Sequence, residues 1–104
     1  MKTRDEIRSV ILNHQKELRE KFKVKKVGIF GSYAKGEQVE KSDLDMIIGF
    51  EKRATIDVWE YIGLMMDLEE YLQKLFGMKV HLASKSHAVQ SEKWKNIEKE
   101  LIYV

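Results

Sequence analysis

The feature that most restricts the fold of this chain is a small-residue turn that follows one apolar run, together with two aspartates at the start of a second apolar run. The run Val27-Gly28-Ile29-Phe30 leads directly into Gly31-Ser32. Ten residues separate Ser32 from Asp43, and Asp43 and Asp45 stand at the start of a second apolar run. Short apolar runs bounded by turn residues are typical of strands. The pattern therefore predicts two strands joined by a turn and a polar loop.

The residue types in this turn and this pair indicate a particular chemistry. A small-residue turn after a strand presents bare backbone N–H groups, which suit phosphate oxygens, and Gly31 allows the close approach that a phosphate needs. Asp43 and Asp45 lie two apart on a strand, so both side chains point to the same face. There they repel each other unless a cation lies between them. The combination predicts a site for a nucleoside triphosphate with a divalent metal.

Alternation along the second predicted strand assigns its two faces. One face carries four apolar residues, namely Leu44, Met46, Ile48 and Phe50. The other carries Asp43, Asp45 and Ile47. Because the apolar face must pack on the helices, the carboxylates are expected on the opposite surface. Burial gives no reason for two carboxylates at these positions, whereas metal binding does.

The spacing Gly-Ser, ten residues, Asp-x-Asp after a strand resembles the nucleotidyltransferase superfamily that includes DNA polymerase beta. For so short a chain the resemblance is greatest to the minimal nucleotidyltransferases, which are partners of HEPN-domain toxins. It rests on residues 27–50 and extends by order of elements over nearly the whole chain. It implies an α+β fold with a small mixed sheet packed on helices, in one domain over residues 1–104. It also implies ATP as the substrate and Mg²⁺ held by Asp43 and Asp45.

The resemblance also implies roles for three further residues. Ser32 adds its hydroxyl and N–H to the triphosphate contacts of Gly31. Lys35 lies where the family has a basic residue in a Gly-Ser-x-Ala-Arg-Gly pattern, which suggests a phosphate contact, with ordinary surface charge as the alternative. Ser42 matches the family's Ser-Asp pair and is expected to shape the loop or support the Asp43 carboxylate.

His81 departs from the family's pattern. The minimal enzymes have a third carboxylate in a Lys-Val-Asp-Leu motif, and here the sequence reads Lys79-Val80-His81-Leu82. Alternation turns His81 outward, towards the aspartates. An imidazole there is a candidate general base, a metal ligand poorly suited to Mg²⁺, or a histidine without a role. Glu51 is a remote substitute for the missing acid, with a solvated loop charge as the alternative.

These resemblances imply an antitoxin that transfers AMP from ATP to a hydroxyl, a tyrosine, of a HEPN-domain toxin. With about a hundred residues and no second domain, a macromolecular acceptor is favoured over a small molecule such as an aminoglycoside. The alternative is a catalytically impaired module that binds nucleotide and neutralises its partner by binding alone. The replacement of the third acid by His81 is the reason for this alternative.

Composition excludes several other classes. The chain has 104 residues, no cysteine and a formal net charge of +2, so thiolate metal sites and disulfides are excluded. No apolar stretch approaches the ~20 residues of a membrane span, and a cytoplasmic location is expected. The basic cluster at residues 21–26 lacks the stacking aromatics of a nucleic-acid binder, so no direct nucleic-acid contact is expected. Self-association is left open.

The remaining periodicities predict the other elements. They are a helix over 4–22 with a Thr3–Glu6 capping box, a helix from Thr55 to Phe76 ended by Gly77, a strand over 78–83, a polar loop over 84–90 that contains His87, and a last helix capped by Ser91 with the stripe Trp94, Ile97 and Leu101. His14 is expected to be a partly buried structural residue on the first helix. Trp59, Ile62 and Met66 form a second apolar patch, which indicates either a protein interface or cover by a terminal helix.

Overall fold

A mixed sheet of four strands, in the order β3-β2-β1-β4, organises the computed structural model, which describes residues 2–51 and 57–104. The strands are β1 (Val24–Phe30), β2 (Leu44–Phe50), β3 (Val80–Ser84) and β4 (Ile102–Tyr103). Strand β1 pairs antiparallel with β2 and β4, whereas β2 and β3 are parallel. The α+β class and the small mixed sheet expected from the sequence are confirmed.

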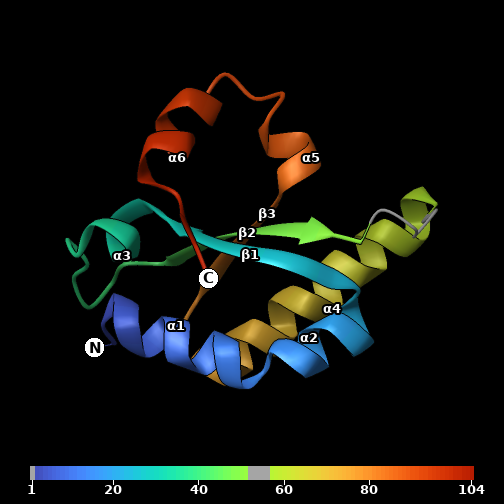
Figure 1. The fold of residues 1–104 in the computed structure, drawn as a ribbon, viewed down its shortest axis with the longest axis horizontal. Coiled ribbons are helices and arrows are strands. Elements are labelled where there is room, and N and C mark those ends of the chain that lie inside the picture. Colours follow the sequence, from blue (N-terminus) through green and yellow to red (C-terminus); the bar gives the residue numbers. More distant parts are fainter. Residues whose placement is uncertain (1, 52–56) are drawn as a thin grey trace.

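The helices are divided between the two faces of the sheet (Figure 1). Helices α1 (Arg4–Asn13), α2 (Gln15–Phe22) and α4 (Val58–Phe76) lie on one side. The short helices α5 (Lys85–Ala88) and α6 (Trp94–Glu100) lie on the other, and α3 (Gly31–Lys35) follows β1 at its end. The carboxylate-bearing face is therefore flanked by the C-terminal segment.

The single N-terminal helix predicted over 4–22 is divided at His14. The capping box between Thr3 and Glu6 is present, so the predicted start is correct. At His14 the backbone leaves the helical region (φ −111°, ψ 12°), and the imidazole Nδ1 lies 2.8 Å from the carbonyl oxygen of Val10. A side chain that bonds to the carbonyl four residues earlier competes with the helix ladder. His14 is half-buried and structural, as expected, but it separates two helices.

The core lies between the sheet and helices α1, α2 and α4. The predicted apolar face of β2 is confirmed, since Leu44, Met46 and Ile48 are all 0% exposed. On the opposite face Ile47 is also buried, because the chain after α6 covers it. A Cβ on Gly28 would lie 2.6 Å from Leu101 Cδ1 and 2.8 Å from Ile47 Cγ2, so this glycine is what lets the C-terminal segment reach the sheet.

The C-terminal third differs most from the sequence-based expectation. The predicted loop over 84–90 contains α5, and strand β4 was not foreseen because two residues give no periodicity. The strand predicted over 78–83 begins instead at Val80 and ends at Ser84. Ser91 accepts a hydrogen bond from the Lys93 N–H at 3.1 Å, but the residue that caps α6 is Lys93, so this prediction was wrong by two positions.

The two ends of α4 have different outcomes. Gly77 ends the helix in the left-handed conformation (φ 66°), as predicted. Thr55 lies outside the described residues, and the cap of α4 is Asp57, whose carboxylate accepts the Glu60 N–H at 2.8 Å. Asp57 gave the same type of sequence signal two residues later.

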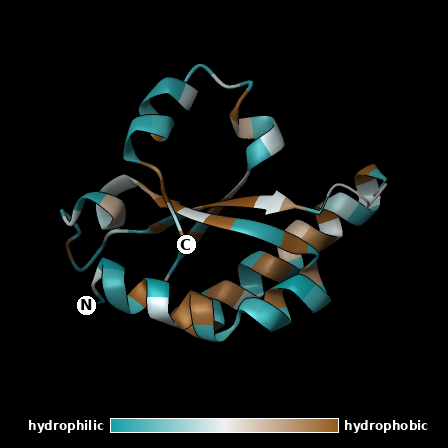
Figure 2. Ribbon diagram, in the orientation of Figure 1, coloured by the Kyte–Doolittle hydropathy of each residue, from teal (hydrophilic) through white to brown (hydrophobic). Residues whose placement is uncertain are grey.

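The second apolar patch on α4 is exposed. Trp59 is 82%, Ile62 42% and Met66 66% exposed, so within residues 2–51 and 57–104 neither terminal helix covers it. Figure 2 shows brown hydrophobic segments at this end of α4 and a largely hydrophilic α6. None of the helices in the described part of the chain combines the length and apolar character that crossing a bilayer requires. The patch is therefore an exposed apolar surface in the described part of the chain.

One contact between helices makes stability sensitive to alkaline pH. The Tyr71 hydroxyl on α4 donates to Glu17 Oε2 on α2 at 2.8 Å, and burial together with this contact raises the pKa of Tyr71 to about 12. Its pKa in the unfolded chain is about 10. The contribution is complete below pH 10 and is lost as the pH rises towards 12. We expect wild-type protein to lose more stability than Tyr71→Phe over this interval, as measured by urea denaturation at both pH values.

Candidate functional site

The turn after β1 brings its backbone against one of the two aspartates. Gly31 has φ +74°, a conformation that strongly favours glycine. A Cβ built on Gly31 would overlap Asp45 Oδ2. The preceding residue, Phe30, is paired with Asp45 in the β1–β2 ladder. The structure therefore brings together the turn and the Asp45 carboxylate, whose side chain points towards the turn.

The second aspartate is held by His81. In the parallel β2–β3 ladder His81 is paired with Asp45, and its Nε2 lies 2.8 Å from Asp43 Oδ2. Val80, the preceding residue, is buried in the core, so the outward orientation of His81 follows from strand alternation. His81 and Asp43 are both substantially exposed, with 54% and 38% of their side-chain surface accessible. An exposed imidazole beside a carboxylate is accessible to an incoming substrate.

The electrostatics of the site are unfavourable for a bare Asp45 carboxylate. Burial raises the pKa of Asp45 above its ordinary value, and the charges of Asp43 and Glu100 raise this pKa further. The proximity of His81 lowers the pKa and offsets part of the effect. A half-buried carboxylate among other carboxylates has the surroundings that a bound cation would relieve.

Glu100 is a site residue that the sequence analysis missed. Its Oε2 accepts the Gly31 N–H at 3.1 Å, and its Oε1 lies 3.2 Å from Lys35 Nζ. The hydrogen bond to Glu100 is the main reason that the pKa of Lys35 is raised, and Glu37 at 3.8 Å is a secondary partner. No local motif marks Glu100, because its place depends on the two-residue strand β4.

A cleft adjoins the aspartates. It has a volume of about 410 Å³, and its walls include Asp45, His81, Lys79, Lys93 and Ile97. Lys93 and Ile97 belong to the segment around α6, so the C-terminal segment supplies one wall. The carboxylate surface is therefore not fully open, although the length of the chain had favoured a macromolecular acceptor over a small molecule. The two lysines were not singled out from the sequence, where they lie among many other basic residues.

The other predicted residues lie at different distances from this centre. Ser32 is the second residue of α3, directly after Gly31. Ser42 Oγ accepts the Val39 N–H at 2.9 Å, which gives Ser42 a role in shaping the loop. Glu51 follows the far end of β2, about 20 Å along the strand from Asp45. It is too distant from Asp45 to take part in the same site. His87 lies on α5, where its ring stacks beside Tyr61 with centroids 5.3 Å apart.

The donor set fits a hard divalent cation. Asp43 and Asp45 supply carboxylate oxygens, the ligands that Mg²⁺ prefers. Among the described residues no three histidine or acidic side chains are gathered as a ready-made metal centre. A cation held by two carboxylates and completed by substrate oxygens is the usual magnesium arrangement in phosphoryl-transfer sites. The residues present therefore fit a metal that arrives with the nucleotide.

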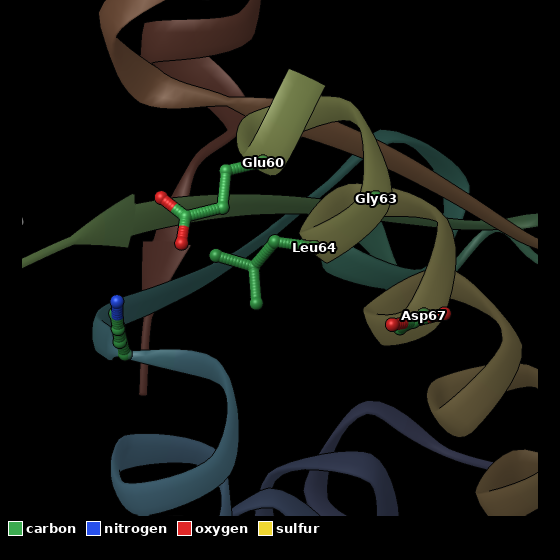
Figure 3. A pocket seen from close by; sticks show the side chains of 5 residues that line it. Glu60, Gly63, Leu64 and Asp67 are labelled. Carbon is green, nitrogen blue, oxygen red and sulfur yellow. The ribbon is translucent and has the colours of Figure 1, made fainter. Parts of the chain in front are cut away.

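A second hollow, of about 330 Å³, lies on the other side of the molecule. Figure 3 shows its α4 wall, where Glu60 and Leu64 point into the hollow and Gly63 and Asp67 lie along its edge. Lys23, which follows α2, completes the lining. It contains neither Asp43, Asp45 nor the turn at Gly31, so it is separate from the candidate active site.

The contact between Gly31 and Asp45 can be tested by substitution. Gly31→Ala should destabilise the fold by about 1–3 kcal/mol from backbone conformation alone, with an added cost from overlap with the Asp45 carboxylate. Gly36→Ala is the matched control, because Gly36 has φ +70° and a Cβ there would meet nothing within 4 Å. Thermal unfolding should show a larger loss for Gly31→Ala. Equal losses would show that the turn and Asp45 are not in contact.

The geometry can be compared with known proteins. The sequence profile of the family described as "Nucleotidyltransferase domain" matches residues 11–104. MJ1379 of Methanocaldococcus jannaschii, provisionally named a protein adenylyltransferase, is 42% identical over 104 residues, which is 100% of both chains. The protein adenylyltransferase MntA of Thermococcus cleftensis is 40% identical over 104 residues, covering 100% of this chain and 98% of MntA.

Solved structures share the fold. A provisionally assigned minimal nucleotidyltransferase superposes with a TM-score of 0.65 at 24% identity, covering 97% of this chain and 95% of that one. A crystal structure of the toxin–antitoxin pair MntA–HpeT, in a mutant form, gives a TM-score of 0.60 at 15% identity, with 98% and 72% covered. The profile match and the full-length relatives lead to one conclusion: the chain belongs to the minimal nucleotidyltransferases of the nucleotidyltransferase domain family, the group that includes MntA.

Proposed function

We propose that this protein transfers AMP from ATP to a hydroxyl group, a tyrosine, of a HEPN-domain toxin and so acts as its antitoxin. The observation that carries the proposal is the contact between the glycine turn and Asp45, with Asp43 joined to the same site through His81. It unites a phosphate-binding backbone and a carboxylate pair within one site. The protein adenylyltransferase name of full-length relatives at 40% identity and above supports the same activity.

The residues of the site divide the work of the reaction. Gly31 and Ser32 offer the turn to the phosphates, and Lys35 and the cleft lysines Lys79 and Lys93 supply positive charge. Asp43 and Asp45 would hold Mg²⁺, which when bound neutralises charge on the triphosphate. Most of the catalytic effect then comes from positioning and fixed charge, as is general for phosphoryl transfer.

The chemical step needs an acceptor for one proton. The acceptor oxygen forms a bond to the α-phosphorus, the bond from that phosphorus to the bridging oxygen breaks, and pyrophosphate leaves. The hydroxyl proton passes to His81. If Nε2–H donates to Asp43, then Nδ1 keeps a free lone pair for this proton, and the Asp43 contact fixes that tautomer. His81 thereby takes the position and part of the role of the family's third acid.

The acceptor is a hydroxyl of a protein, because the molecule carries an apolar patch suited to docking. The walls of the cleft beside Asp45 include residues of β3 and of the segment around α6, and an acceptor group presented by another chain would enter between them. The exposed residues Trp59 and Met66 provide surface for that chain away from the cleft. A related fold has been crystallised as a toxin–antitoxin pair, which is consistent with such an assembly.

A second candidate is a module that binds its partner without transferring AMP. Two features favour it: His81, which stands where the resemblance to the family implies a third carboxylate, and Glu100, which occupies the Gly31 N–H that a phosphate would need. Loss of a general base typically costs ~10²–10⁴ in rate. Such a protein would neutralise its partner by steric masking.

The two candidates are separated by incubating the protein with α-labelled ATP, Mg²⁺ and a HEPN-domain protein. Covalent label on the partner, released by phosphodiesterase and mapped to a tyrosine by mass spectrometry, supports AMP transfer. A stable but unlabelled complex that still suppresses the partner's toxicity supports the binding module. Neither label nor complex would reject the assignment of this partner.

A further inference from the structure

We propose that Glu100 is an internal occupant of the phosphate-binding turn, which a nucleotide must displace, so that this residue sets the affinity for triphosphates. The inference rests on the proposed function, because it concerns the same turn. It adds a residue that lies outside the Gly-Ser and Asp-x-Asp motifs.

The Glu100 carboxylate contacts the types of donor that bind a phosphate group. One carboxylate oxygen of Glu100 accepts the Gly31 N–H at 3.1 Å, and the other lies 3.2 Å from Lys35 Nζ. A backbone N–H and a nearby lysine are the donors that a phosphate group uses. The Glu100 carboxylate therefore carries negative charge where a phosphate oxygen would carry it. Neither donor can bond fully to the Glu100 carboxylate and to a phosphate at the same time.

The pairing of β1 with β4 brings Glu100 to the turn at Gly31. The antiparallel β1–β4 ladder pairs Ile29 with Ile102 and Gly28 with Tyr103. The same register, continued by two residues, sets Glu100 opposite Gly31. The ladder is supported at its other end by the Val104 N–H, which donates to the Val27 carbonyl at 2.9 Å. The β1–β4 pairing thus brings the backbone of Glu100 close to Gly31, and the Glu100 side chain completes the contact.

A glutamate at position 100 is unfavourable for the stability of α6. Glu100 is the last residue of α6, and a carboxylate at a helix C-terminus is unfavourable next to the macrodipole. It also adds negative charge near Asp45. The contacts with Gly31 and Lys35 offset these costs.

The Glu100 side chain is able to move away from the turn at Gly31. The Glu100 side chain remains 29% exposed, and no residue of α6 is buried. A change of its side-chain rotamer would free the Gly31 N–H and Lys35 without unpairing β4. A triphosphate with its larger charge would then replace the carboxylate, and like-charge repulsion would keep Glu100 out while the nucleotide is bound.

The test is nucleotide affinity measured by calorimetry, with ATP and Mg²⁺ and separately with inorganic tripolyphosphate. Glu100→Gln keeps the shape of the side chain and removes its charge, and we expect affinity for both ligands to rise about tenfold. Glu98→Gln is the control, because Glu98 is an exposed carboxylate on the same helix. Its affinity should equal that of wild type. Thermal unfolding checks that both variants are folded.

The outcomes are distinct. An equal or weaker affinity of Glu100→Gln, with binding by wild type intact, overturns the role of Glu100 and leaves the proposed transferase standing. An equal rise in both variants shows a general charge effect and also overturns it. If wild type and both variants bind neither ligand, the nucleotide site itself is rejected, and with it the proposed function.

Discussion

Asp45→Asn is expected to lower AMP transfer by at least ~10²-fold, because charge stabilisation by a bound metal is worth several kcal/mol. Asparagine keeps the size of the side chain, so the turn at Gly31 can retain its conformation. The measurement is initial rate of labelling of the partner by α-labelled ATP at saturating Mg²⁺. Asp67→Asn, an exposed aspartate on α4, is the control and should retain the wild-type rate.

The same substitution is expected to stabilise the metal-free protein at neutral pH. Burial raises the pKa of Asp45 in the folded state above the ordinary value of 3.8. Below pH 3.8 the carboxyl is protonated in both states and has no effect. As the pH rises through the folded pKa, wild type loses stability that Asp45→Asn keeps. Thermal unfolding in chelator should show a higher midpoint for the variant at pH 7 and no difference at pH 3.

A loss of activity together with a gain in stability would identify Asp45 as a residue kept for function at a cost to the fold. If Asp45→Asn were active, the metal assignment would be wrong. If it were less stable than wild type at neutral pH without metal, the carboxylate would be structural. Addition of Mg²⁺ and ATP should raise the unfolding midpoint of wild type and leave that of the variant nearly unchanged.

Most of what the sequence could predict about the site came from the Gly-Ser and Asp-x-Asp motifs and from strand alternation. The faces of β2 followed from alternation alone, since the apolar residues at 44, 46 and 48 had only one direction in which to be buried. The outward orientation of His81 followed from the same rule. The turn at Gly31 followed from its residue type, because the positive φ and the approach of Asp45 leave no room for a side chain.

The parts that the sequence did not predict depend on contacts between distant segments. Strand β4 has two residues and no pattern of its own, and it exists because Gly28 leaves space for Leu101. The position of Glu100 follows from that strand, so it was also missed. The division of the first helix at His14 arises from one side-chain hydrogen bond that the apolar stripe does not reveal.

His81→Asp is expected to raise AMP transfer, by as much as ~10²-fold, if the native site is limited by its missing acid. The register sets position 81 opposite Asp45, and the native imidazole already reaches Asp43 at 2.8 Å. A carboxylate at this position would add a third oxygen ligand for Mg²⁺ and a stronger attraction for the metal. Labelling of the partner at several Mg²⁺ concentrations would show both the higher rate and a lower metal requirement.

The variant should also carry a stability signature that a mere change of base would not produce. Three carboxylates without a cation repel one another, so metal-free His81→Asp should unfold at a lower temperature than wild type, and Mg²⁺ should restore it. His87→Asp on α5 places the same charge on a helix outside the cleft lining and should show neither effect. Slower transfer by His81→Asp would show that a carboxylate at this position accepts the proton less well than the imidazole does, and that a third oxygen ligand for Mg²⁺ does not compensate for this loss.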